Sequence, residues 1–335
     1  MKAMVLRAPG GLDRLELVDV PDPPAPAAGE IRVRLHASSL NFHDYRVVSA
    51  AVPTKVDRIP MADGAGVVIE VGDGVTEFVP GDHVVSCFFP TWQDGPAEIG
   101  DFSTVPGDGV DGYAREIVVQ PARCFTHSPK AFSHAEAATL TTAGLTAWRA
   151  LVVNGGLKCG DTVLALGTGG VSIYALQMAK QMGAKVIVTS SSDEKLERAR
   201  ALGADHTINY RATPEWGEAV KRWTHGRGVD HVIELGGPGT LAQSIAAVRI
   251  GGHISLIGTI TGRSGDVPTA ALMVKQARLE GLIVGNRRQQ QDMVRAIDAT
   301  GLRPVIDRSF PLAALADAFR YEASAAHFGK ICVEF

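Results

Sequence analysis

The chain has 335 residues, with 33 Lys and Arg against 36 Asp and Glu and a formal net charge of −3. It has no run of like charge, no apolar segment long enough to span a membrane and no signal-peptide core near its start, which argues against a nucleic-acid-binding, membrane or secreted protein. The four cysteines are scattered, without a Cys-x-x-Cys pair, as is typical of a reduced, cytoplasmic protein.

The length suggests about two domains of ~150 residues each. Residues 1–125 predict short strands punctuated by Pro and Gly, followed by helices and apolar strands that alternate from His134 onward. That alternation predicts an α/β domain with a doubly wound parallel sheet. After Thr300 the chain turns β-like again and ends in a strand, Gly329–Phe335. We therefore expect one domain from residues 1–125 and 300–335, and a second, inserted domain from residues 126–299.

A strand, a glycine-rich turn, a helix and a second strand follow Asp161. The strands are expected at Val163–Leu166 and Lys185–Thr189, with the helix at Val171–Met182 between them. Such a turn brings backbone N–H groups and the helix N-terminus against a pyrophosphate. We expect these residues to bind a dinucleotide: Gly167, Thr168, Gly169, Gly170 and Val171. The third glycine of the G-x-G-x-x-G pattern is replaced by Ser172, and a strand–turn–helix without a ligand is the alternative.

The end of the second strand bears on the choice of cofactor. An NAD site usually has an acidic residue about 20 positions beyond the first glycine, where it binds the ribose 2′-hydroxyl. Here that neighbourhood holds Ser190 and Ser191, while Asp193 and Glu194 fall in the next helix together with Lys195. Hydroxyls and an ammonium suit a 2′-phosphate, so we expect NADP (NADPH) in preference to NAD. Helix capping by Ser191 and Glu194 is the other interpretation, and both can hold.

Further motifs occur in a fixed order along the whole chain. They are Met1-Lys-Ala-Met-Val-Leu, Ala37-Ser-Ser-Leu-Asn-Phe-His-Asp-Tyr, Asp63-Gly-Ala-Gly-Val-Val, Val79-Pro-Gly-Asp-His-Val, Gly112-Tyr-Ala-Arg-Glu, Thr142-Ala-Gly-Leu-Thr-Ala-Trp and Gly329-Lys-Ile. With the glycine turn, they resemble the medium-chain dehydrogenase/reductase superfamily, in particular its zinc-independent, quinone oxidoreductase-like and alcohol dehydrogenase-like branch. The resemblance implies a Rossmann domain inserted in a GroES-like β-barrel domain.

The motifs also bear on zinc. Zinc-dependent members of the family resemble this chain but carry a Cys near position 41 and a Gly-His-Glu before the Gly-Ala-Gly. Here those positions hold Asn41 and Met61-Ala-Asp63, and the loop from Trp92 to Gly112 lacks the cysteines of a structural zinc lobe. An amide and a methyl group cannot replace thiolate and imidazole ligands, so we expect no zinc. Cys87 is interpreted as a small buried residue.

The resemblance implies a site in a cleft between the domains, with further cofactor contacts in the interdomain helix and near strand ends. These are Thr146, Tyr210, Leu235, Gly236, Ile257, Gly258, Val284 and Asn286. Glycines at strand ends that merely terminate strands are the alternative for Gly236 and Gly258. A strand-end tyrosine with its hydroxyl in water is the alternative for Tyr210.

Hydride transfer to a carbonyl, an enone or a quinone leaves negative charge on oxygen, which a hydrogen-bond donor must stabilise. The candidates are the Asn41 amide, the Tyr45 phenol and the Thr142 hydroxyl. His43 could move protons, although a histidine that only lines the pocket is the stronger interpretation. Tyr45 could likewise only line an apolar pocket.

The chain is therefore expected to be an NADPH-dependent oxidoreductase that acts on a small-molecule quinone, enone or related carbonyl. A zinc-free alcohol dehydrogenase or ketone reductase and a non-catalytic nucleotide-binding protein are the alternatives. Family resemblance also implies a homodimer formed edge to edge, through strands such as His253–Gly258 and Leu279–Val284.

Overall fold

The computed structural model describes residues 1–51, 54 and 56–335. The chain forms two compact units: unit 1 comprises Met1–Leu145 and Val284–Phe335, and unit 2 comprises Thr146–Ile283. From the sequence we expect domain borders after residues 125 and 299. The borders between the compact units of the structure fall after residues 145 and 283. None of the helices in the described ranges has the length and apolar character needed to cross a membrane.

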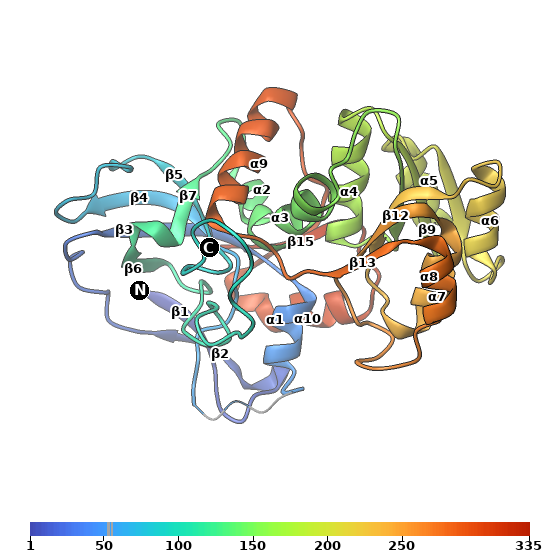
Figure 1. The fold of residues 1–335 in the computed structure, drawn as a ribbon. Helices are drawn as coiled ribbons and strands as arrows, with labels where there is room; N and C mark the ends of the chain where they lie inside the picture. The colour runs from blue at the N-terminus through green and yellow to red at the C-terminus, as the bar shows by residue number, and fades with distance from the viewer. Residues whose placement is uncertain (52–53, 55) are drawn as a thin grey trace. The chain divides into compact units, whose positions relative to one another are not determined.

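Unit 2 is built on a parallel sheet of six strands (Figure 1). In spatial order they are β10 (His206–Asn209), β9 (Lys185–Ser190), β8 (Thr162–Leu166), β11 (Val229–Glu234), β12 (Val248–Leu256) and β13 (Arg278–Gly281). Every neighbouring pair is parallel. The strand order reverses beside β8, and ligands of such folds bind at the carboxyl ends of the strands near this point. The predicted doubly wound α/β sheet is confirmed.

Helices connect these strands and cover the sheet, which is why β8 and β11 are buried along their whole length. They are α4 (Gly170–Gln181), α5 (Asp193–Ala201), α6 (Trp216–Trp223), α7 (Pro238–Ala247) and α8 (Thr269–Lys275). Helix α4 packs on β8 and β9, whereas α7 packs on β11, β12 and α6. Leu164, Ile187, Val232 and Ile254 belong to the apolar core between the layers.

Two local predictions in unit 2 are wrong. The expected strand Leu279–Val284 is observed as Arg278–Gly281, so its last three residues are not extended; Val284 has φ +46°, which is incompatible with an extended strand. Helix α5 is capped by Ser192, whose Oγ accepts a hydrogen bond from Lys195 N at 3.3 Å, and not by Ser191. Three consecutive serines each have a side chain that can cap, and the backbone conformation decides which one does.

Unit 1 contains a seven-stranded sheet. Its strands run β14 (Ile306–Pro311), β15 (Lys330–Glu334), β3 (Glu30–Ser39), β4 (Ala65–Val71), β5 (His83–Ser86) and β7 (Phe125–His127), and β6 (Ile117–Pro121) also pairs with β3. A separate antiparallel pair is formed by β1 (Lys2–Leu6) and β2 (Leu15–Asp19).

The helices of unit 1 are short, apart from one. They are α1 (Phe42–Val48), α2 (His134–Ala138), α9 (Arg287–Thr300) and α10 (Leu315–Ala323). After α2 the chain makes a π-helical turn, Leu140–Gly144, and continues as α3 (Leu145–Trp148). The register of β3 with β15 pairs Ser39 with Cys332, and the same register brings Lys330 level with Asn41.

Candidate functional site

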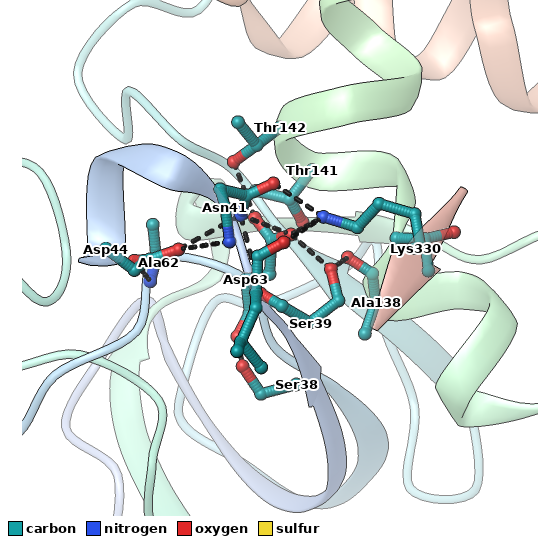
Figure 2. Close-up of polar contacts among 12 residues, drawn as sticks. Ser38, Ser39, Asn41, Asp44, Ala62, Asp63, Ala138, Thr141, Thr142 and Lys330 are labelled. Carbon is teal, nitrogen blue, oxygen red and sulfur yellow. Dashed lines mark hydrogen bonds and ion pairs between the residues drawn. The ribbon is translucent and has the colours of Figure 1, made fainter. Parts of the chain in front are cut away.

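Asp63 is the centre of a buried polar cluster in unit 1 (Figure 2). It lies just before β4 and has no exposed surface. The Thr142 hydroxyl donates to Oδ1 at 2.6 Å, while Oδ2 accepts from the Ser39 hydroxyl at 2.5 Å and from the Asn41 amide at 2.9 Å. The Ser38 hydroxyl donates to the backbone oxygen of Asp63 at 2.6 Å. A carboxylate with this many donors is held in a fixed orientation.

Asn41 is engaged on both sides of its amide. Its Nδ2 donates to Asp63 Oδ2 and, at 3.1 Å, to Asp44 Oδ2, while its Oδ1 accepts from Lys330 Nζ at 2.6 Å. An amide nitrogen has two hydrogens to donate, and here both are directed at carboxylates. Asn41 therefore organises the cluster and has no hydrogen left for a substrate.

Two carboxyls and one ammonium are buried together in this cluster. Lys330 is 3% exposed and its Nζ lies 3.9 Å from Asp63 Oδ2; it also donates to the backbone oxygen of Leu40. Burial, together with the neighbouring Asp63, raises the pKa of Asp44 to about 6. Burial also raises the pKa of Asp63, against the opposing effect of Lys330. Burial of the two carboxyls therefore favours a state in which one of them is protonated, whereas both would be ionised in water at neutral pH.

Local backbone geometry sets these positions. Met61 has φ +81°, a strained conformation for a non-glycine residue, in the turn that leads to Asp63. The same turn directs Ala62 N to Asp44 Oδ1 at 2.9 Å. Thr142 lies in the π-helical turn, and such turns occur frequently at functional sites because they displace one residue from the helical pattern.

Tyr45, the third predicted donor, is outside the cluster. It lies on α1, where its ring is 5.9 Å from Phe42 and 6.5 Å from Phe319 between centroids. It packs half-buried against the apolar core of unit 1, and no hydrogen bond reaches its hydroxyl from the described residues. His43 lies 3.4 Å from Asp108 and packs against Phe88 and Phe102.

In unit 2, the glycine turn has the geometry of a phosphate loop. Gly167 has φ +77°, a conformation that side chains disfavour, and α4 begins directly after Gly169. No side chain in the described part of the chain caps α4, so the N–H groups of its first turn are available to an anion. Ser172, in place of the third glycine, donates to the backbone oxygen of Leu166 at 2.6 Å and fits the helix against β8.

The structure brings Ser190 and Tyr210 together at the carboxyl ends of β9 and β10. Tyr210 N donates to the Ser190 backbone oxygen at 3.1 Å, and the Ser190 Oγ accepts from Ser192 N at 3.2 Å. Ser191 and Lys195 lie on the turn into α5 and on its first turn. Arg211 follows Tyr210 and is exposed.

The ends of β11 and β12 also meet. Ile257 N and Gly258 N donate to the backbone oxygen of Glu234, at 2.9 and 3.2 Å. A Cβ on Gly258 would lie 2.2 Å from the Leu235 backbone oxygen, so close packing requires glycine there. Gly236 N donates to the buried Glu234 carboxylate at 2.8 Å. These glycines therefore have a packing role of their own.

The remaining predicted cofactor residues are divided between the units. Thr146 is buried in unit 2, whereas Val284 and Asn286 belong to unit 1. The Asn286 Oδ1 accepts from Gln289 N at 2.8 Å at the start of α9, and its Nδ2 donates to the Gly95 backbone oxygen at 3.2 Å.

Comparison with known proteins finds family models that match segments of both units. Residues 27–130 match the family model described as alcohol dehydrogenase GroES-like domain, and residues 170–299 match that described as zinc-binding dehydrogenase. A zinc-type alcohol dehydrogenase-like protein of Schizosaccharomyces pombe is 41% identical over 334 residues, covering 97% of this chain and 96% of the relative. The chain belongs to the medium-chain dehydrogenase/reductase superfamily.

Two further similar proteins support the same family assignment. A chloroplast envelope quinone oxidoreductase homologue of Arabidopsis thaliana is 30% identical over 338 residues, covering 97% of this chain and 95% of that protein. A solved structure from Sinorhizobium meliloti, described as a candidate alcohol dehydrogenase, superposes with a TM-score of 0.91 at 41% identity and full coverage of both chains. This member of the superfamily is an NAD(P)-dependent oxidoreductase with the GroES-like and Rossmann domains of the family.

Some of these descriptions mention zinc, but the corresponding residues of this chain do not suit a zinc site. Asn41 and Ala62 lack zinc-binding groups, and the Lys330 ammonium lies beside Asn41 and Asp63, where it would repel a cation. In the described ranges, no group of three His, Cys, Asp or Glu side chains is placed to hold a metal ion. Cys87 is buried, and burial raises the pKa of its thiol, which disfavours the thiolate.

Sequence analysis missed five members of the cluster: Ser38, Ser39, Asp44, Lys330 and its centre, Asp63. Ser39 and Asp44 stand in the motif around Asn41, and Lys330 in the terminal Gly-Lys-Ile, so the motifs held the signal. The motifs do not reveal the pairing of β3 with β15, which brings residues 41 and 330 together.

Proposed function

We propose that this chain is a zinc-independent, NADPH-dependent reductase of quinones, enones or related carbonyls. The observation that carries the proposal is the buried Asn41–Asp63–Lys330 contact, in which an amide and a carboxyl are already engaged with each other and with an ammonium. A lysine cation supplies fixed positive charge without an open coordination position, so the substrate oxygen must find its polarising partner among protein hydrogen-bond donors.

NADPH, when bound, supplies the hydride. The uncapped first turn of α4 and the turn at Gly167 bind the pyrophosphate. Ser191, Lys195 and Arg211 supply the hydroxyl and positive charges that suit a 2′-phosphate. Thr142 is the polar group of the unit 1 cluster that reaches the surface, since its side chain is half-buried while Asp63 is fully enclosed.

The first test combines a zinc assay on the purified protein with calorimetry of NADPH and NADH binding to metal-stripped protein. We expect no stoichiometric zinc, tight binding of NADPH and weaker binding of NADH. Ser191→Asp should weaken NADPH binding by roughly tenfold or more, because a carboxylate then faces the 2′-phosphate. NADH lacks that phosphate and offers its 2′-hydroxyl to the new carboxylate, so its binding should not weaken and serves as the internal control.

Oxidation of NADPH by metal-stripped protein is then followed with a quinone, an enone and a ketone. Turnover without zinc supports the proposal. Zinc-dependent activity, or a preference for NADH with alcohols, would favour an alcohol dehydrogenase, the function suggested by the 41% identical relative. Cofactor binding without turnover of any substrate class would point to a non-catalytic nucleotide-binding protein.

The protein is also proposed to form a homodimer through the β13 edge of unit 2. In the part of the chain that the structure describes, β13 ends the sheet, and its backbone can pair with a second copy. Helix α8 beside it has no buried residue, and Met273 and Val274 are 71% and 69% exposed. Apolar side chains exposed next to a sheet edge fit an interface between copies.

A further inference from the structure

The cluster around Asp63 has an unbalanced charge if every group is ionised. Asp44 and Asp63 would contribute two negative charges, and Lys330 one positive charge, all in a buried site. A buried excess charge is costly, so the neutral arrangement keeps one proton on the carboxyl pair. Glu322 on α10 also faces Lys330 and both aspartates, and burial raises its pKa to about 8, so it is mostly protonated at neutral pH.

The way out of the cluster passes through Thr142. Its hydroxyl is 2.6 Å from Asp63 Oδ1, the carboxyl oxygen that neither Ser39 nor Asn41 contacts. Thr142 is half-buried, whereas Ser38, Ser39, Asp63 and Thr141 have no exposed surface. Figure 2 shows Thr142 at the edge of the cluster opposite Ser38. At this distance one hydrogen joins the two oxygens: Thr142 donates when Asp63 is a carboxylate, and Asp63 donates to Thr142 when Asp63 carries the proton.

We propose that Thr142 and Asp63 form a proton-transfer pair that protonates the substrate oxygen during carbonyl reduction. This inference rests on the proposed function. Thr142 is the catalytic residue, because its hydroxyl contacts the substrate oxygen, and Asp63 supplies the proton through it. Asn41, Asp44 and Lys330 are positioning residues that hold Asp63 and keep one proton in the cluster.

The substrate carbon gains the hydride with its electron pair, and the carbonyl π pair moves onto the oxygen. That oxygen forms a bond to the Thr142 proton as the Oγ1–H bond breaks; Oγ1 takes the proton of Asp63 as the Oδ1–H bond breaks. Asp63 is left as a carboxylate, which Lys330 stabilises, and it regains a proton from water through Thr142 after the product leaves. Alcohol oxidation would run the same transfers in reverse.

The pair matters most for substrates whose reduced anion is strongly basic. An alkoxide from a ketone or aldehyde must be protonated as it forms, whereas a quinone yields a phenolate, a much weaker base that can leave unprotonated. The inference therefore predicts the substrate class on which the site gives its largest advantage: simple carbonyls rather than quinones.

The test compares Thr142→Val, Thr142→Ser and Thr141→Val with wild type, on one ketone and one quinone. Valine keeps the shape and removes the hydroxyl; serine restores it. We expect Thr142→Val to lower kcat on the ketone by about 10²–10⁴-fold, the usual contribution of positioned acid–base groups. Its loss on the quinone should be less than about tenfold, serine should recover most of the ketone activity, and the Kd for NADPH should not change.

Thr141→Val is the matched control. The Thr141 hydroxyl donates to the Ser86 backbone oxygen at 2.9 Å and lies 3.1 Å from the Ser86 hydroxyl, so it is hydrogen-bonded to Ser86 and not to Asp63; this variant should lose stability but keep kcat. Wild-type kcat on the ketone should also fall as pH rises and the cluster loses its proton to solvent, and Asp63→Asn should flatten that profile. The titratable groups facing Asp63 are Asp44, Glu322, Lys330 and Cys332, and His43 faces Asp44.

Equal ketone kcat and equal pH profiles in wild type and Thr142→Val would overturn the inference while leaving the proposed function intact. Wild-type turnover of quinones alone would also overturn it, since no proton pair is then needed. Wild-type protein that binds NADPH but reduces nothing would instead refute the proposed function. Thr142→Val and Thr142→Ser leave every carboxyl in place, so the test does not depend on Asp63→Asn folding.

Discussion

Lys330 is the residue on which the charge balance of unit 1 depends. Replacing it by Met should reduce the free energy of unfolding by about 3–5 kcal/mol at pH 8, because two buried carboxyls lose their counter-charge. Urea unfolding measures this loss. Lys185→Met, at the exposed first position of β9, is the matched control and should change stability by no more than about 0.5 kcal/mol.

The pH dependence of this loss has a definite sign. The pKa of Asp44 is raised to about 6 from an ordinary value of 3.8, so the folded protein holds this proton more tightly than the unfolded chain. The contribution of Asp44 to stability is therefore largest at low pH and is lost as pH rises through about 6. Without Lys330 the carboxyl pKa values rise further, and protonation can relieve the repulsion. The penalty of Lys330→Met should be smaller at pH 5 than at pH 8, and an equal penalty would contradict this account.

At the scale of elements, the close approach of β11 and β12 depends on one missing side chain. Gly258→Ala should reduce the free energy of unfolding by about 1–3 kcal/mol, since its Cβ would overlap the Leu235 backbone oxygen. Gly100→Ala is the control, because a Cβ there meets nothing within 4 Å. Chemical denaturation compares the two. Unchanged stability in Gly258→Ala would mean that the strand ends can separate freely.

At the scale of the molecule, the proposed β13 interface predicts a particle of twice the 35.4 kDa chain mass in light scattering. Met273→Lys together with Val274→Lys should shift the protein toward the monomer, because two charges would be buried between copies. Val79→Lys, at a 60% exposed position in unit 1, is the control. A wild-type monomer at micromolar concentration would refute this interface.

The sequence predicts the architecture better than the cluster because the two depend on different information. The strands of unit 2 are short apolar runs separated by helical periodicity, and the chirality of βαβ connections then limits their order. The Asn41–Lys330 contact instead depends on the register of β3 and β15, which are far apart in the chain. Asn41 was therefore expected to donate to a substrate, and only the observed neighbours show that its amide is fully used.

The division of unit 1 into two chain segments has a consequence for synthesis. Asn41, Asp44 and Asp63 leave the ribosome before any part of unit 2, whereas Lys330 follows all of it. Unit 2 is one continuous segment, so all of its residues are available once residue 283 has been synthesised. The aspartates of unit 1 can pair with the Lys330 ammonium only after the last strand has been synthesised. Until then the carboxyls of the first segment stay hydrated, and β3 lacks the strand that pairs with it at this edge.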